Sequence, residues 1–260
     1  MKNKSNIVNI FWSGGWDSTF RIVELSRMPV MIQPIYAFGD GRKSEKYERQ
    51  AMNDILSALR NCNKTVAKFN PMIFININDI PEDSKITEAY NLIHDNTQLG
   101  SQHEWLACIA KEYSGIEIGT EAAELESSRI LTALNQYGHL IKDEKTNSFY
   151  LDTENSTREG LLVFGNITFP IIDKTKIEMK NILQDWGDNY INIMMKTWFC
   201  HTPISNKPCG FCHPCMVAIE GGMTFRVSSR ALKRYNIYKK YGKYKVFSKV
   251  FNAYRKFRTK

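Results

Sequence analysis

Short apolar runs alternate with amphipathic segments along the first half of the chain. The apolar runs have the length and residue types of β-strands and cover residues 7–12, 30–38, 71–77 and 116–118. The amphipathic segments carry apolar residues at helical spacing, and they begin near residue 19 or cover residues 43–60, 86–95 and 101–113. Strands that alternate with helices predict an α/β fold with a doubly wound parallel sheet. Pro34 lies in the second run and lacks a backbone donor, so we expect that strand to be an edge strand or to begin irregularly.

The pattern is less regular in the second half of the chain. Residues 140–152 have the pattern of a hairpin, and residues 155–160 are expected to form a polar loop. An apolar run resumes at 161–164, and residues 169–174 lead into a helix that ends near Trp186.

Charge and cysteine content separate the C-terminal part from the rest. Residues 226–260 contain thirteen basic residues and no acidic one, whereas the remainder holds 22 basic and 27 acidic residues. The net charge of +8 therefore belongs to a tail. We expect a main α/β domain at 1–195, a small four-cysteine subdomain at 196–225 and a basic, aromatic helical tail at 226–260. No stretch is long and apolar enough for a membrane span and no signal peptide precedes the first strand, so we expect a cytoplasmic protein.

A glycine-containing turn joins the first apolar run to the first helical segment. It consists of Ser13, Gly14, Gly15, Trp16, Asp17 and Ser18. Glycines let an anionic group approach the backbone, and the N–H groups of a first helical turn have no intrahelical acceptor. The serine hydroxyls can donate to phosphate, and Asp17 can cap the helix or hold Mg²⁺. The turn therefore predicts a phosphate-binding site; an ordinary glycine-rich connection is the alternative.

Four cysteines crowd into one short C-terminal segment, and they are Cys200, Cys209, Cys212 and Cys215. Two overlapping Cys-x-x-Cys steps and a fourth thiol can close a tetrahedral shell around Zn²⁺. A closed shell leaves no position for a reacting water, so we interpret the site as structural. Free thiols, a redox pair and an iron–sulfur cluster are the alternatives.

The two motifs together carry a family resemblance. Ser-Gly-Gly-x-Asp-Ser resembles the PP-loop of the ATP pyrophosphatases, which split ATP into AMP and pyrophosphate while adenylating a substrate; it is not the Walker pattern, because no Gly-Lys-Ser/Thr follows. With the cysteine motif added, the chain resembles the 7-cyano-7-deazaguanine synthase family, more weakly over most of residues 7–220. That family activates 7-carboxy-7-deazaguanine as an acyl-adenylate, aminates it with ammonia and dehydrates the amide to a nitrile with a second ATP. Its zinc is structural.

Three segments depart from the pattern of that family. Residues 37–42 replace its Asp-Tyr-Gly-Gln-Arg-His, and residues 100–102 replace its Gly-Arg-Asn. The loop that meets the deazapurine corresponds to residues 124–129, where only Arg129 matches. The ATP end of the site is kept better than the acceptor end, so adenylation is better supported than any particular carboxylate.

The resemblance places the site residues at the carboxyl ends of the strands. Besides the turn, the residues expected to contact ATP are Phe38, Gly39, Arg42, Gly100 and Gly119. Asp17 is the expected ligand of Mg²⁺, and Lys174 is a catalytic cation for a phosphate, with a solvated lysine as the alternative. Glu121 is an acceptor-side catalytic candidate, with an exposed loop acid as the alternative.

Three functions fit these features. The first is an ATP-dependent ligase that turns a small-molecule carboxylate into an amide or nitrile with ammonia. The second is a divergent paralogue that joins a deazapurine or another carboxylate to a different amine, such as one on a protein. The third is a tRNA-modifying or nucleic-acid-binding protein, or one that binds an anionic membrane, because the tail carries an aromatic residue every three or four positions between its cations. A helix packed on its own domain or on a homodimer mate is the alternative for the tail.

Overall fold

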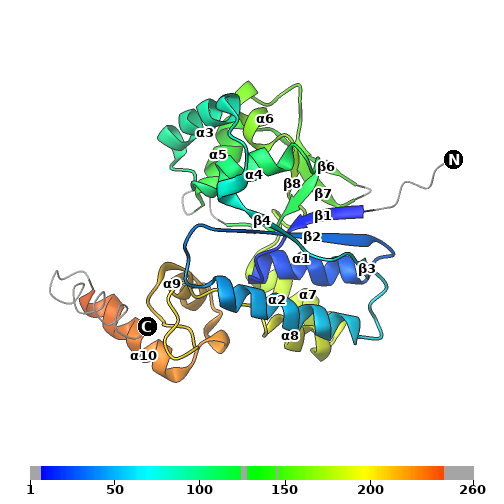
Figure 1. Ribbon diagram of the computed structural model, residues 1–260. Coiled ribbons are helices and arrows are strands. Elements are labelled where there is room, and N and C mark those ends of the chain that lie inside the picture. The colour runs from blue at the N-terminus through cyan, green and yellow to red at the C-terminus, as the bar shows by residue number, and fades with distance from the viewer. Residues whose placement is uncertain (1–6, 124–127, 145, 243–260) are drawn as a thin grey trace.

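The computed structural model describes residues 7–123, 128–144 and 146–242 (Figure 1). These residues contain a six-stranded sheet in which every pair of neighbours is parallel. The order across the sheet is β3 (Lys68–Phe69), β2 (Met31–Phe38), β1 (Ile7–Phe11), β5 (Ile116–Ile118) and β8 (Ile167–Thr168), and β4 (Ile73–Asn76) also pairs with β2. The predicted parallel sheet is confirmed.

Helices cover both faces of the sheet (Figure 1). One apolar core lies against α1 (Trp16–Ser26), α2 (Glu45–Arg60), α7 (Lys176–Trp186) and α8 (Asp188–Met194). A second core lies on the other face, against α3 (Ser84–Thr97), α4 (Gln102–Ala110), α5 (Arg129–Tyr137) and α6 (Arg158–Phe164). Two cores on either side of one sheet are the arrangement of a doubly wound α/β fold.

Pro34 lies in an interior strand, so the expectation of an edge strand is wrong. It pairs with Ile10 on one side, and β3 and β4 flank β2 on the other. Pro34 has the same orientation as Ile32, whose carbonyl accepts from Asn70 N at 2.9 Å, because alternate residues of a strand bond the same neighbour. On this side β2 pairs with β3 up to Ile32 and with β4 from Ile35, so Pro34 lies where β2 has no paired residue. The lack of an N–H group at Pro34 therefore breaks no hydrogen bond between strands.

The predicted hairpin is present as β6 (Leu140–Asp143) and β7 (Ser148–Leu151), paired antiparallel. The polar loop expected at 155–160 is wrong in its second half, because α6 begins at Arg158. The Thr157 side chain accepts from Gly160 N at 3.0 Å and caps the helix, while Val163 and Phe164 are buried in the core.

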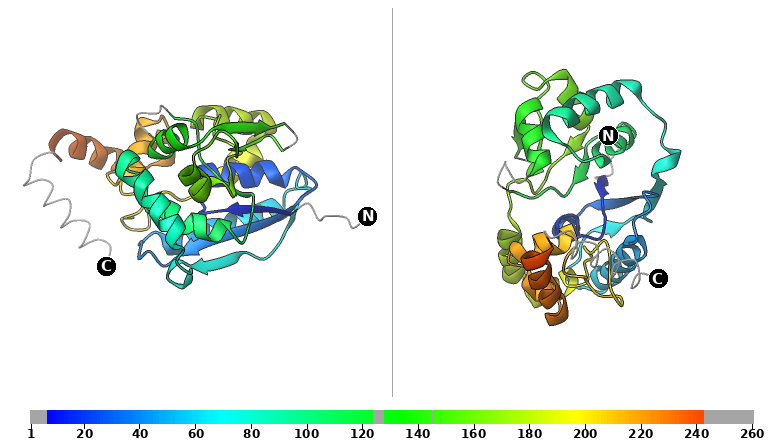
Figure 2. Two further views of the ribbon diagram at one scale, coloured as in Figure 1. Left: turned by 90° about the horizontal axis from the view of Figure 1, so that it is seen from above. Right: turned by 90° about the vertical axis from the view of Figure 1, so that its left-hand side faces the viewer.

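The C-terminal part packs next to α2 at one end of the molecule (Figure 2). It contains the four cysteines, α9 (His213–Glu220), a single turn at Thr224–Arg226 and α10 (Ser229–Tyr241). Ala231 and Tyr235 of α10 are buried, and the Tyr238 ring stacks on Phe211 with centroids 5.9 Å apart. The first part of the tail therefore packs on its own chain; the aromatic positions from Tyr244 onward lie outside the described residues. None of the described helices is long and apolar enough to cross a membrane.

Candidate functional site

The predicted phosphate-binding turn lies where the strand order reverses. From β1 the chain passes to β2 on one side, and β5 occupies the other side of β1. Ligands of open parallel sheets bind beyond the carboxyl ends of the strands at such a switch point. A cleft of about 200 Å³ opens there, lined by the ends of β1, β2 and β5, by Arg42, and by Ser13, Gly15, Asp17 and Ser18 of the turn.

The turn holds the start of α1 open toward the cleft. Gly14 has a φ of +69°, and a Cβ there would lie 3.0 Å from Glu48 O, so both its conformation and its surroundings favour glycine. Gly15 is the N-cap residue, and no side chain in the described part of the chain caps α1. The Ser13 and Ser18 hydroxyl oxygens lie 3.4 Å apart, on the side of the cleft. The first N–H groups of the helix and two hydroxyls thus converge on one small volume.

Trp16 is the residue of the turn that faces away from the cleft. Its side chain is buried, with the Phe225 ring at 6.3 Å and the Arg226 guanidinium at 5.0 Å from the Trp16 ring. Trp16 therefore supports the turn from beneath.

A lysine that the sequence analysis did not select lies beside the turn. Lys176 Nζ is 3.4 Å from Asp17 Oδ1 and forms a closer ion pair with Glu121. The predicted catalytic lysine, Lys174, instead pairs with Asp173 at 2.8 Å. Glu121 shares Lys176 with Asp17, so the structure places this acid next to the phosphate-binding turn, and its acceptor-side role stays a prediction. The capping box of Thr175 and Glu178 fixes the start of α7 and thereby the position of Lys176.

Burial has the largest effect on the pKa of each of these two acids. It raises the pKa of Asp17, against the lowering effect of Lys176 and, more weakly, of Arg226. It also raises the pKa of Glu121, and the charge of Asp17 adds to that rise. Burial lowers the pKa of Arg226 to about 10, which leaves this residue protonated at neutral pH. The fold therefore holds the two carboxylates close together, next to the turn, at a cost in free energy.

Asp17→Asn is expected to raise the free energy of unfolding near neutral pH. A carboxyl whose pKa is higher in the folded than in the unfolded protein contributes its full stability below the unfolded pKa of about 3.9, and that stability is lost as the pH rises through the folded pKa. Asparagine does not ionise, so the gain should be present at about pH 7.5 and vanish near about pH 4. Urea unfolding of both proteins across this pH range measures the difference in their free energies of unfolding. The same difference at about pH 7.5 and about pH 4 would contradict a raised pKa of Asp17.

A buried ion-pair network fixes α1 against β5. Arg21 donates from Nε and Nη2 to both carboxylate oxygens of Glu117, at 2.8 and 2.7 Å, and from Nη1 to Glu24 at 2.5 Å. Removing one partner of such a pair would leave a buried charge uncompensated, at a cost of about 3–5 kcal/mol. The start of α1 is therefore positioned by β5 as well as by its own turn.

Gly119, which lines the cleft at the end of β5, lets α1 approach closely. A Cβ at this position would lie 2.6 Å from Ser18 N. Gly119→Ala is expected to push the turn away from β5, destabilising the fold by about 1–3 kcal/mol and weakening nucleotide binding. Gly100→Ala is the matched control for the change in stability alone, because its Cβ would meet nothing closer than 4.0 Å. Thermal unfolding compares the stabilities of the two variants, and nucleotide titration compares the affinity of Gly119→Ala with that of the unaltered protein. Equal stabilities of the two variants would mean that α1 tolerates displacement from β5.

The β2 side of the cleft is closed by a network around Arg42. Arg42 donates to the Ala37 carbonyl at 2.9 Å and to Glu48 at 3.1 Å, and Tyr36 donates its hydroxyl to Glu48 at 2.7 Å. Arg42 is thus placed in the cleft as expected.

Of the other residues expected near ATP, two lie behind the β2 wall. Phe38 packs against the Arg49 guanidinium at 4.8 Å, and Gly39 lies against Asn76. Gly100 precedes α4, whose residues Gln102, Trp105 and Leu106 form the opposite wall of the cleft.

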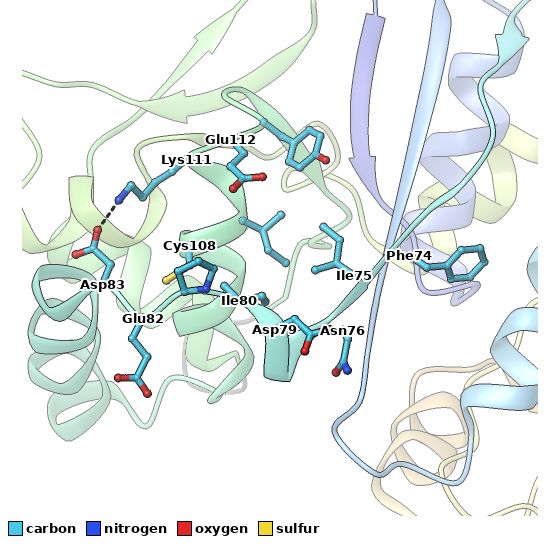
Figure 3. A pocket seen from close by; sticks show the side chains of 13 residues that line it. Phe74, Ile75, Asn76, Asp79, Ile80, Glu82, Asp83, Cys108, Lys111 and Glu112 are labelled. Carbon is cyan, nitrogen blue, oxygen red and sulfur yellow. Dashed lines mark hydrogen bonds and ion pairs between the residues drawn. The ribbon is translucent and has the colours of Figure 1, made fainter.

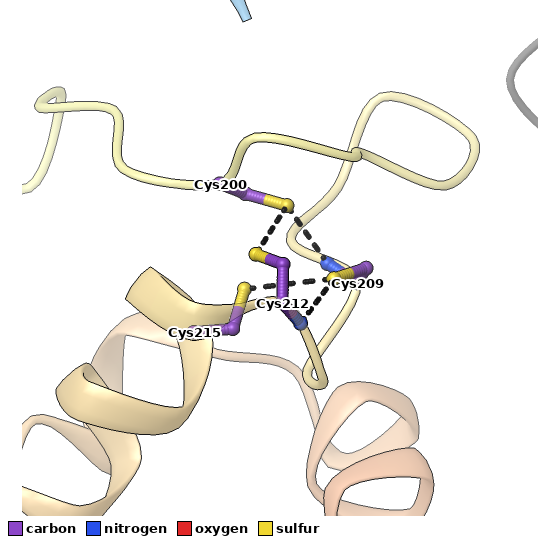
Figure 4. A group of neighbouring side chains, drawn as sticks. All are labelled: Cys200, Cys209, Cys212 and Cys215. Atoms are coloured by element: carbon purple, nitrogen blue, oxygen red, sulfur yellow. Dashed lines mark hydrogen bonds between the residues drawn. The ribbon is translucent and has the colours of Figure 1, made fainter. Parts of the chain in front are cut away.

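The four cysteines form a candidate metal centre (Figure 4). All four are buried, and their Sγ atoms lie within 4.8 Å of one another. The Sγ atoms of Cys209 and Cys215 are 3.8 Å apart, as are those of Cys200 and Cys212. The backbone N–H of Cys212 donates to Cys209 Sγ at 3.2 Å, which suits a thiolate. The arrangement can hold a metal.

α10 covers the cysteine turn. Gly210 has a φ of +90°, and a Cβ there would lie 2.1 Å from Ala231 O. Arg234 donates to the carbonyls of Cys209 and Pro208, at 2.6 and 3.2 Å.

The metal centre is connected to the phosphate-binding turn through Trp198. Its backbone N–H donates to Gly14 O at 2.9 Å, its indole N–H donates to Cys200 O at 2.8 Å, and its ring stacks on Tyr47 with centroids 4.5 Å apart. Arg226 adds hydrogen bonds to Thr197. The segment that leads into the cysteine cluster is therefore part of the wall that supports the turn.

Comparison with known proteins gives no close relative. The sequence matches no family model, and no curated protein matches it. Among solved structures, a U34-tRNA thiolase, NcsA from Methanococcus maripaludis with its [4Fe-4S] cluster, is similar at 12% identity and a TM-score of 0.36, over 91% of this chain and 72% of that one. A predicted subunit of a tRNA methyltransferase from Methanocaldococcus jannaschii is similar at 14% identity and a TM-score of 0.28, over 70% of this chain and 90% of that one. Similarity at these TM-scores does not indicate an activity. The function is therefore inferred from the geometry of the site.

Proposed function

We propose that this chain binds ATP in the cleft at the switch point and transfers AMP to an acceptor, releasing pyrophosphate. The observation that carries the proposal is the start of α1 behind the Gly14–Gly15 turn, which no described side chain caps. It opens to a cleft lined by Asp17, and Lys176 Nζ lies 3.4 Å from the carboxylate of Asp17. A triphosphate needs donors and positive charge in one place, and the helix N-terminus, the hydroxyls of Ser13 and Ser18, and Lys176 supply them.

Asp17 and Glu121 fit a role as ligands of Mg²⁺. Within the described residues, Asp17 Oδ1 is buried with no contact to a polar group other than its ion pair with Lys176, and both carboxylates offer the oxygen ligands that Mg²⁺ prefers. When bound, Mg²⁺ would neutralise charge on the phosphates. The chain itself then positions ATP for in-line attack on the α-phosphorus, and Lys176 stabilises the negative charge that grows on the departing pyrophosphate.

We propose a carboxylate as the acceptor, on the resemblance to the 7-cyano-7-deazaguanine synthase family. Two residues of the cleft wall could contact such an acceptor, because Trp105 has an aromatic ring and Gln102 has an amide group. Of the segment at 124–129, only Ser128 and Arg129 belong to the described residues.

The decisive experiment supplies ATP, Mg²⁺, 7-carboxy-7-deazaguanine and ammonium to the purified chain and measures AMP, pyrophosphate and the product mass. AMP together with the amide or nitrile supports the ligase. AMP without either product, with a mass shift on a co-purified protein, supports the paralogue that conjugates a carboxylate to a protein amine. No AMP with any acceptor, tRNA included, would refute adenylation.

We propose Zn²⁺ for the four-cysteine centre. With Zn–S bonds of about 2.3 Å, the sulfurs of a tetrahedral site lie about 3.8 Å apart, which is the separation in the Cys209–Cys215 and Cys200–Cys212 pairs. Each cysteine that holds a [4Fe–4S] cluster binds a different iron, so the four cysteine sulfurs must lie further apart than around a single metal ion. Metal analysis of the purified chain, with one zinc and no iron or sulfide expected, tests this.

A further inference from the structure

A second pocket, of about 480 Å³, lies at the C-terminal end of α4, whereas the cleft is lined by residues nearer the start of that helix. Figure 3 shows it between β4, the end of α4 and the start of α3. Ile75, Ile80 and Ile109 give it an apolar floor, and Phe74 points to the opposite face of the strand. It shares no lining residue with the cleft.

One wall of this pocket is an open sheet edge. In the described residues β2 is the only strand that pairs with β4, so the outer edge of β4 carries backbone groups without a partner strand. Natural sheets protect such edges with charged residues, proline or bulges. The β4 sequence, Ile73 to Asn76, has none of these and is rich in β-branched and aromatic residues.

The rim of the pocket is acidic. Four carboxylates, Asp79, Glu82, Asp83 and Glu112, line it with a single lysine, Lys111. Lys111 is paired with Asp83 at 2.5 Å, and Asp83 also caps α3 by accepting from Lys85 N and Ile86 N. The other three side chains are exposed and form no ion pair within the described part of the chain. Three negative charges therefore surround an apolar floor and an open strand edge.

We propose that β4 and this pocket bind an extended, basic segment of a partner protein as an added strand. Main-chain hydrogen bonds to the β4 edge would provide affinity, and alternate side chains would meet the apolar floor and the acidic rim. A second copy of the chain fits less well, because edge-to-edge pairing of two β4 strands would bring two acidic rims together. A nucleic acid would be repelled by the same carboxylates.

The probe is a fluorescein-labelled peptide in which lysine and valine alternate over seven residues, titrated against the full-length protein at low salt. Saturable binding is expected, and it should weaken as salt rises. The acidic counterpart with glutamate for lysine should not bind. A peptide N-methylated at every residue keeps the charge but has no backbone N–H to donate from either edge, so it should bind at least about tenfold more weakly.

Glu82→Lys with Glu112→Lys should weaken binding of the basic peptide about tenfold. Glu88→Lys is the matched control, because Glu88 is an exposed residue of α3 outside the pocket and its reversal should leave affinity unchanged. The peptide should also slow alkylation of Cys108, which lines the pocket, and leave Cys62 unaffected.

Three results would overturn the proposal. The first is an N-methylated peptide that binds as tightly as the unmethylated one. The second is a Glu82→Lys, Glu112→Lys protein that binds the basic peptide as tightly as the unaltered protein. The third is dimerisation of the protein through the β4 edge that prevents the peptide from binding. Each readout is a binding measurement without ATP, so failure here is separate from failure of the proposed adenylation.

Discussion

Lys176→Met is expected to lower the rate of ATP-dependent AMP formation by about 10²- to 10³-fold. Lys176 Nζ lies 3.4 Å from Asp17 at the start of α1, where the proposed pyrophosphate would leave. Methionine keeps a flexible stem of similar length and removes the charge, so the loss should fall mainly on kcat. Initial rates of AMP release over a range of ATP concentrations separate kcat from KM.

Lys174→Met is the matched control. It removes the same charge two residues away, where Lys174 is paired with Asp173 rather than with the turn. Its rate should stay within about threefold of the unaltered protein, because a partly exposed ion pair contributes little. If the control loses more activity than Lys176→Met, the assignment of the cation is reversed and the interpretation based on sequence alone was the better one.

Cys209→Ser is expected to abolish metal binding and, with it, most of the proposed ATP turnover. A structural zinc site contributes about 10 kcal/mol or more to folding, which is comparable with the whole stability of a domain. Residues 197–226 would then lose their order, and Gly14 would lose the hydrogen bond from Trp198 N. We expect a metal content near zero, a lower melting temperature and faster hydrogen exchange at residues 13–18.

Cys108→Ser is the matched control for this change, because Cys108 lies outside the metal centre. It should retain the metal and the activity. A Cys209→Ser protein that binds ATP normally without metal would show that the turn does not depend on the C-terminal unit.

Features that depend on local sequence were predicted well. The parallel sheet follows from alternating periodicities, and the cysteine cluster follows from spacing alone, since thiols a few residues apart must lie close together. The start of α6 was missed because the polar stretch at 155–160 conceals a threonine cap, Thr157, in front of a helix.

The partners of the turn are distant in sequence, and so they were beyond the reach of local patterns. Lys174 and Lys176 are both lysines near one helix start, and only the direction of the first turn of α7 brings Lys176 to Asp17. The capping box at Thr175 was the available signal, since it locates the first residue of the helix. No spacing rule predicts that Arg21 meets Glu117 or that Trp198 meets Gly14.

The bond between Trp198 and Gly14 also bears on synthesis of the protein. Residues 13–18 leave the ribosome before residues 197–226, whose contacts support them. A nascent chain therefore carries this turn without those contacts until residues 197–226 have been added. On the proposal that the four cysteines hold a metal, the turn gains its full support only after they have emerged and bound it, so the supply of that metal would limit the rate at which new molecules mature.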